Sequence, residues 1–124
     1  LFYFLVSFTV AAALFCCVLA GIGLVLPCFP VGFRSSWSQY TLQLPEVLYL
    51  YALQARLKDQ DVPTMVYYPK PMHGQKAFEG AHLCSDGCPV TKRLCETALS
   101  LPMGPCLKRA DSEAVSSTLK GTFS

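Results

Sequence analysis

The sequence predicts an α+β domain in which a small antiparallel sheet is covered by helices and preceded by an apolar N-terminal helix. Three observations support this class: alternating apolar and polar residues at 37–44, leucines at helical spacing within 50–57, and a β-branched and aromatic run at 62–68. Strands and helices in this mixed order are typical of a sheet with helices segregated to one face. With 124 residues, the chain has room for one small domain.

The N-terminal residues 1–26 are almost wholly apolar, and the first charged side chain is Arg34. About 20 such residues suffice to cross a bilayer as a helix, so this run alone indicates a transmembrane helix. A single-span membrane protein with a small cytosolic module is therefore one hypothesis. The other is an aberrant N-terminus from a truncated or misread gene. In both cases residues 1–29 form a hydrophobic segment separate from a globular part at residues 30–124.

The globular part is predicted to begin with a strand and a helix. Residues 37–44 alternate in the manner of a half-buried strand. Pro45 suits the first turn of a helix, and leucines at positions 50, 53 and 57 then recur on one helical face.

Residues 62–75 are predicted to form a central strand that ends in a rigid, polar loop. Side chains at 62–68 fit a pleated, half-buried surface. Pro69 and Pro71 remove two backbone donors, so the strand must end there. A strand end that presents polar groups on a rigid loop is a common place for a binding site. The polar side chains that this loop carries are Lys70, His73 and Gln75.

The C-terminal third is predicted to contain two further helices and a short strand. Residues 75–87 show no sustained period and are expected to form a loop. Pro89 suits a helix start, and that helix leads into a strand at 99–101. The last helix is expected from about Arg109 to Lys120, with acidic residues near its N-terminus as the helix dipole favours.

Charge and cysteine content exclude some classes of function. A net charge of +2, with basic residues scattered among acids, gives no electrostatic reason to expect a nucleic-acid partner. The seven cysteines are odd in number and match no known disulfide framework. Reduced thiols in a cytoplasmic protein are therefore favoured over a secreted protein.

A zinc-binding module is a weaker alternative. Histidine and cysteine ligand types gather within sixteen positions, and a Cys-x3-Cys spacing occurs in zinc sites. The pattern lacks a second tight pair, so loop cysteines without a ligand are the favoured interpretation. The candidate zinc ligands are His73, His82, Cys84 and Cys88.

The string YYPKPMHGQKAF at residues 67–78 resembles the signature near the C-terminus of the DegT/DnrJ/StrS family of pyridoxal-phosphate-dependent sugar aminotransferases. Two more pieces stand in the family's order, at residues 35–42 and 88–103. The resemblance covers about residues 30–124 and leaves 1–29 unmatched. Two departures concern loop packing: Gly74 replaces a usual aliphatic residue, and residues 104–106 replace His-Pro-Tyr.

The resemblance implies that the chain is a fragment, the C-terminal small domain of a fold-type I enzyme. Such enzymes use pyridoxal phosphate to transfer an amino group, usually from glutamate, to a keto-sugar carried on a nucleotide. The implied partners are the nucleotide-sugar substrate, the large domain and a second subunit of a homodimer. In the family the loop at 67–78 lies at the mouth of the active site, so Tyr68, Lys70, His73 and Gln75 are expected to contact substrate.

The family's Schiff-base lysine lies in the large domain, in a stretch of Lys followed by Gly-Glu-Gly-Gly. No such stretch occurs here. Transamination needs that lysine and a carboxylate on the pyridinium nitrogen. The chain alone is therefore expected to be inactive and to bind no cofactor covalently.

Overall fold

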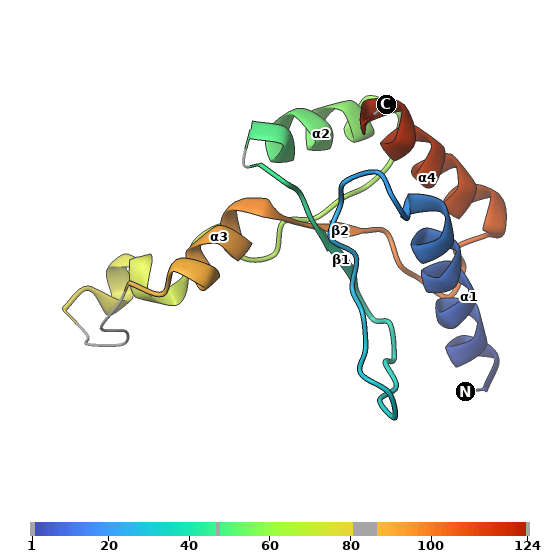
Figure 1. The fold of residues 1–124 in the computed structure, drawn as a ribbon, viewed down its shortest axis with the longest axis horizontal. Helices are drawn as coiled ribbons and strands as arrows, with labels where there is room; N and C mark the ends of the chain where they lie inside the picture. Colours follow the sequence, from blue (N-terminus) through green and yellow to red (C-terminus); the bar gives the residue numbers. More distant parts are fainter. Residues whose placement is uncertain (1, 47, 81–86, 124) are drawn as a thin grey trace.

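The computed structural model describes residues 2–46, 48–80 and 87–123, and Figure 1 shows their arrangement. The elements, with η denoting short 3-10 helices, follow in the order α1 (Phe2–Leu19), β1 (Tyr40–Gln43), α2 (Leu48–Lys58), η1 (Met72–Gly74), η2 (Lys76–Phe78), α3 (Pro89–Thr97), β2 (Ala98–Leu101) and α4 (Arg109–Phe123). This order confirms the predicted α+β class.

The sheet consists of β1 and β2 paired antiparallel, with Tyr40 opposite Leu101. One further segment joins each edge through a single antiparallel bridge. Val25 exchanges two backbone hydrogen bonds with Gln43 at 3.1 and 2.9 Å, and Met65 exchanges two with Ser100 at 3.1 and 2.9 Å. Four chain segments therefore lie side by side, although only the central two are strands.

The predicted central strand at 62–68 is thus reduced to one bridged residue, which corrects that prediction. Continuing the pairing of Met65 with Ser100 would place Pro63 opposite Pro102, and proline has no N–H to donate. In the other direction Tyr67 would pair with Ala98, whose N–H already donates to the Leu94 carbonyl at the end of α3. Neither neighbouring pair can form its two hydrogen bonds.

Prolines limit the opposite edge of the sheet in the same way. Extending the pairing of Val25 with Gln43 would place Pro45 in one neighbouring pair and Pro27 in the other. Each lacks the N–H that the pair would need. Both outer segments are therefore held to the sheet at a single position.

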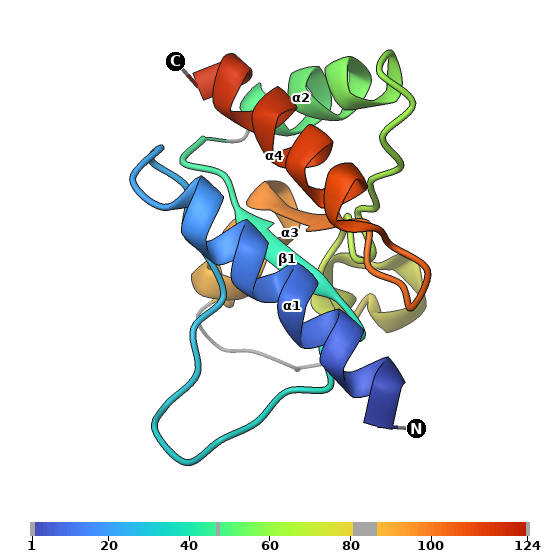
Figure 2. The ribbon, with the colours of Figure 1, turned by 90° about the vertical axis from the view of Figure 1, so that its right-hand side faces the viewer.

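Helices α1 and α4 lie side by side across one face of the sheet (Figures 1 and 2). The sheet side chains on this face are at most 4% exposed: Tyr40, Leu42, Leu99 and Leu101. Helix α2 contacts α4 and buries the leucines at 50, 53 and 57, which confirms its predicted apolar face. The core thus lies between the sheet and a layer of helices.

Helix α1 belongs to this core, and the transmembrane interpretation of residues 1–26 finds no support. The helix ends at Leu19, and none in the described part of the chain is long and apolar enough to cross a membrane. Phe15 is fully buried with its ring 5.1 Å from that of Tyr40, and the Cys16 thiol lies 3.1 Å from the Tyr40 hydroxyl. Side chains from both sides of the predicted boundary at residue 29 therefore share one core.

Helix α4 contributes buried serines as well as apolar side chains. Val115 and Leu119 are 4% and 0% exposed. The Ser116 hydroxyl donates to the Ser112 carbonyl at 2.7 Å, and the Ser112 hydroxyl donates to the Lys108 carbonyl. Backbone carbonyls of α4 and of the residue just before it therefore satisfy both buried hydroxyls, so these small side chains can occupy the helix interface without an unpaired polar group.

Replacing Phe15 by Ala should lower the free energy of unfolding by about 3–5 kcal/mol, because a fully buried ring leaves a cavity beside Tyr40. The matched control is Phe33→Ala, since Phe33 is 71% exposed and should cost less than about 0.5 kcal/mol. Urea unfolding followed by circular dichroism would measure both. Equal losses for the two variants would show that α1 is not packed on the sheet.

Burial, with a smaller contribution from the Cys16 thiol, raises the pKa of the Tyr40 phenol well above its ordinary value. The folded state therefore prefers the neutral phenol. This contribution to stability is complete below the unfolded pKa of about 10 and is lost as the pH rises beyond it. The free energy of unfolding should fall more steeply above that pH for the natural chain than for Tyr40→Phe. Parallel slopes in urea titrations would contradict the assignment.

Candidate functional site

The face of the sheet opposite α1 and α4 is polar. Thr41 of β1 and Ser100 of β2 are directly opposite each other in the pairing register. Their hydroxyl oxygens are 2.7 Å apart and hydrogen-bonded. Because side chains alternate along a strand, these residues must point away from the buried Leu42 and Leu99. The sheet thus presents a hydroxyl pair on its uncovered side.

A cavity of about 440 Å³ lies over this hydroxyl pair. Its lining comes from three parts of the chain: the sheet, the loop at 66–75 and the outer surface of α3. We call it the sheet-face cavity, and its lining residues are Gln39, Thr41, Val66, Tyr67, Tyr68, Lys70, Pro71, Met72, Gln75, Thr91, Leu94, Cys95, Ala98 and Ser100.

The structure brings three of the four predicted site residues to this cavity. Tyr68, Lys70 and Gln75 line it, and Tyr68 is 76% exposed. His73 is half-buried in η1 and does not line the cavity. Two backbone hydrogen bonds close the turn of η1. The Gly74 amide donates to the Pro71 carbonyl at 3.0 Å, and the Gln75 amide donates to the Met72 carbonyl at 3.1 Å. His73 lies within this turn.

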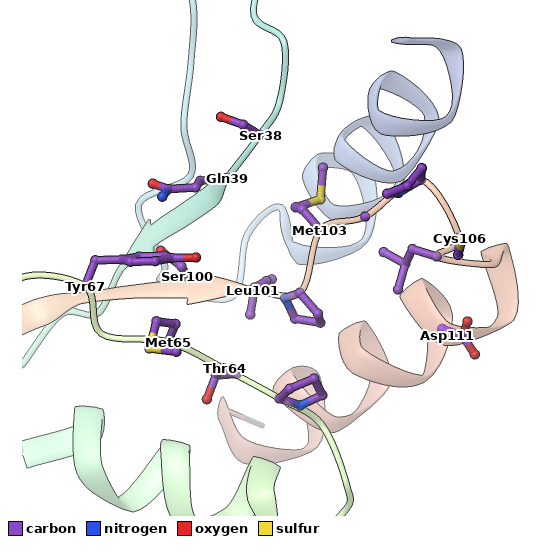
Figure 3. A pocket seen from close by; sticks show the side chains of 15 residues that line it. Ser38, Gln39, Thr64, Met65, Tyr67, Ser100, Leu101, Met103, Cys106 and Asp111 are labelled. Carbon is purple, nitrogen blue, oxygen red and sulfur yellow. The ribbon is translucent and has the colours of Figure 1, made fainter. Parts of the chain in front are cut away.

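A second cavity of about 470 Å³ adjoins the first, and Figure 3 shows it from close by. It lies between the segment at 63–67 and the connection from β2 to α4. Gln39, Tyr67 and Ser100 line both cavities. The Tyr67 side chain lies near Ser100 and Gln39 in Figure 3, so Tyr67 stands at the boundary between the two cavities.

The chemistry of the sheet-face cavity is that of binding. Lys70 is the one charged side chain among the described residues that line it. A lysine ammonium meets phosphate or carboxylate oxygens, while hydroxyl and amide groups pair with the hydroxyls of a sugar. Tyr68, Met72 and Leu94 add apolar surface. The cavity can therefore bind an anionic ligand with hydroxyl groups.

Several of these lining residues were missed in the sequence. The polar positions of the two predicted strands were a usable signal for Thr41 and Ser100, because they alternate with buried leucines. The contribution of α3, through Thr91, Leu94 and Cys95, depends on how that helix packs beside the loop. No local pattern indicates that contact.

The described residues do not fit covalent attachment of pyridoxal phosphate. A Schiff-base lysine is activated by desolvation in a buried setting or by a neighbouring cation. All six lysines of the chain are exposed.

The zinc alternative finds no support either. No group of three metal-ligand side chains occurs within the described ranges. His82 and Cys84 lie outside those ranges. Cys88 is disulfide-bonded, whereas the other described cysteines are free. A disulfide sulfur offers no thiolate to a metal, and the expectation that all thiols are reduced is wrong for Cys88.

Comparison with known proteins gives consistent matches. The model of the DegT/DnrJ/EryC1/StrS aminotransferase family matches residues 11–120. The match begins within α1 and so includes part of residues 1–29, where the motifs alone show no resemblance.

Two curated relatives illustrate the similarity. The UDP-N-acetyl-3-dehydro-alpha-D-glucosamine 3-aminotransferase of Acidithiobacillus ferrooxidans is 34% identical over 105 residues, which cover 85% of this chain and 27% of that relative. The UDP-2-acetamido-2-deoxy-3-oxo-D-glucuronate aminotransferase of Pseudomonas aeruginosa is 33% identical over 79% of this chain and 26% of its own length. The chain thus spans about a quarter of these relatives.

Solved structures show the same fold. A DegT DnrJ EryC1 StrS aminotransferase from Brucella abortus superposes with a TM-score of 0.86 at 29% identity, over 96% of this chain and 31% of that one. DesV of S. venezuelae, in complex with a ketimine intermediate, superposes with a TM-score of 0.88 at 24% identity, over 97% of this chain and 32% of that one.

Proposed function

Because the chain belongs to the DegT/DnrJ/EryC1/StrS aminotransferase family, we propose that it forms the substrate-entrance part of a sugar aminotransferase. The complete enzyme would transfer an amino group, from glutamate, to a keto-sugar carried on a nucleotide. The names of two relatives support this class of substrate, since both describe UDP-linked sugars with a keto group at carbon 3. Pyridoxal phosphate would supply the amino-group carrier in the complete enzyme.

The observation that carries the proposal is the convergence of Tyr68, Lys70 and Gln75 on one cavity. Lys70 would meet a phosphate of the nucleotide, and Gln75 would hydrogen-bond a sugar hydroxyl as donor or acceptor. The exposed Tyr68 would add ring surface and a hydroxyl. His73, two positions from Gln75, would reach the substrate from the edge of the loop.

The cofactor and its lysine would come from outside this chain. The described lysines are all exposed, and the chain spans 27% and 26% of the two relatives. We propose that the large domain of a family enzyme supplies the Schiff base, and that a second subunit completes the assembly. This chain would then bind and orient the sugar nucleotide at the entrance.

Treating the isolated chain with pyridoxal phosphate and then borohydride should leave no stoichiometric adduct on any one lysine. Exposed lysines react weakly and without preference, because nothing holds the aldehyde beside them. Peptide mapping by mass spectrometry would detect the adducts. One dominant modified lysine would show that the chain has a cofactor site of its own.

The role of the loop can be tested by placing residues 35–124 in a complete, active relative. Lys70→Ala should weaken the half-reaction with the nucleotide keto-sugar and spare the half-reaction with glutamate, which lacks the phosphates. A loss of one contact to a charged group corresponds to about 1.5–3 kcal/mol. The matched control is Lys76→Ala, since Lys76 is also exposed but does not line the cavity.

His73→Ala in the same chimera separates two roles for that side chain. Contact with the substrate predicts a loss confined to the keto-sugar half-reaction, which single-turnover kinetics would resolve. Damage to both half-reactions would show that His73 supports the loop instead.

For the lysine pair, equal effects of Lys70→Ala and Lys76→Ala would contradict the proposed contact of Lys70 with the substrate.

A further inference from the structure

The ring of Tyr67 stands between the two adjoining cavities, and the contacts described so far leave it unused. It is 50% exposed and lines both the sheet-face cavity and the second cavity. None of the ring contacts among the described residues involves it. The pairing of Met65 with Ser100, two positions away, holds the segment that carries this ring. An exposed aromatic ring at the wall of a cavity is a platform on which another planar ring can stack.

The two cavities carry opposite charges. Asp111 is the one charged residue among the described lining of the second cavity, whereas the sheet-face cavity has Lys70. The Asp111 carboxylate accepts a hydrogen bond from the Lys108 amide at 3.0 Å, which holds it at the start of α4. Because like charges repel, a phosphate is favoured beside Lys70 and disfavoured beside Asp111. A nucleotide that uses both cavities is therefore oriented with its uncharged end in the second one.

The lining of the second cavity suits a nucleobase better than a sugar. Met65, Leu101 and Met103 contribute apolar side chains to it (Figure 3). Each hydroxyl of a buried sugar needs a hydrogen-bond partner, whereas a base has two flat faces that stack and one polar edge. The Gln39 amide, which lines both cavities, offers a donor and an acceptor to such an edge.

We propose that the second cavity binds the base of the nucleotide, with Tyr67 as its stacking platform and Gln39 as its hydrogen-bonding partner. This inference rests on the proposed function, in which Lys70 meets a phosphate and Gln75 a sugar hydroxyl. Base, phosphate and sugar then lie across the two cavities in the order in which a sugar nucleotide carries them. The volumes of about 470 and 440 Å³ are each typical of a small-molecule site, for which about 300–1,000 Å³ is usual.

UDP and pyrophosphate are suitable probes, because both carry the phosphates and only UDP carries a base. Calorimetric titration of the full chain should give a lower Kd for UDP. Tyr67→Ala should raise the Kd for UDP at least about fivefold, as loss of one stacked base predicts, and should change the Kd for pyrophosphate less than about twofold. Tyr67→Phe keeps the ring and should change neither Kd more than about twofold.

Two further variants control for general effects. Tyr51→Ala removes a tyrosine that is 65% exposed and lines neither cavity, so it should leave both Kd values unchanged. Gln39→Ala should raise the Kd for UDP about threefold or more, as loss of a hydrogen bond predicts, and should spare pyrophosphate. Circular dichroism would verify that each variant is folded.

The two probes separate the base site from the proposed function. Equal Kd values for UDP and pyrophosphate, or equal losses for Tyr67→Ala and Tyr67→Phe, would overturn the base site and leave the phosphate contact of Lys70 standing. Lys70→Ala should weaken both probes, and no effect on either would contradict that contact instead. A chain that binds neither probe would overturn the base site, while kinetics of the chimera would still decide the proposed function.

Discussion

The structure depends on covering one face of a sheet that is too small to stand alone. Two paired strands are marginally stable in water without a packed face, and here the cover comes from α1 and α4. The contact of the Phe15 ring with Tyr40, at 5.1 Å, joins the first helix to the first strand. The apolar character of the N-terminal run follows from this requirement, because α1 contributes Ala12, Phe15 and Leu19 to the core.

The covered face determines where the candidate site can be. Alternation along β1 and β2 sends leucines toward the helices and Thr41 and Ser100 to the other side. The loop at 66–75 and α3 then enclose the space above these hydroxyls. The core and the candidate site thus use opposite sides of the same four-residue strands, and a substitution on one face need not disturb the other.

Local patterns predicted the helices and strands well and their limits poorly. The leucine spacing of α2 and the alternation of β1 are properties of neighbouring residues, and both elements formed. The strand expected at 62–68 failed because Pro63 meets Pro102, which is a fact of pairing between distant segments. The apolar run of α1 indicated a membrane span, since hydropathy does not say whether protein or lipid covers a helix. Likewise, the proline-bounded loop indicated Tyr68, Lys70 and Gln75, while the position of His73 depended on the turn of η1.

Single-position attachment of the outer segments also has a mechanical meaning. Among the described residues, the segment that leads to Lys70 has one backbone pairing with the sheet, between Met65 and Ser100, and proline prevents the neighbouring pair from adding to it. Opening this segment would break those two hydrogen bonds and the contact of Val66 with the core, while the central strands keep their own ladder and their buried leucines. Local opening of this kind requires far less free energy than global unfolding. Opening of the loop over the cavity is therefore expected to need less free energy than separation of the two central strands.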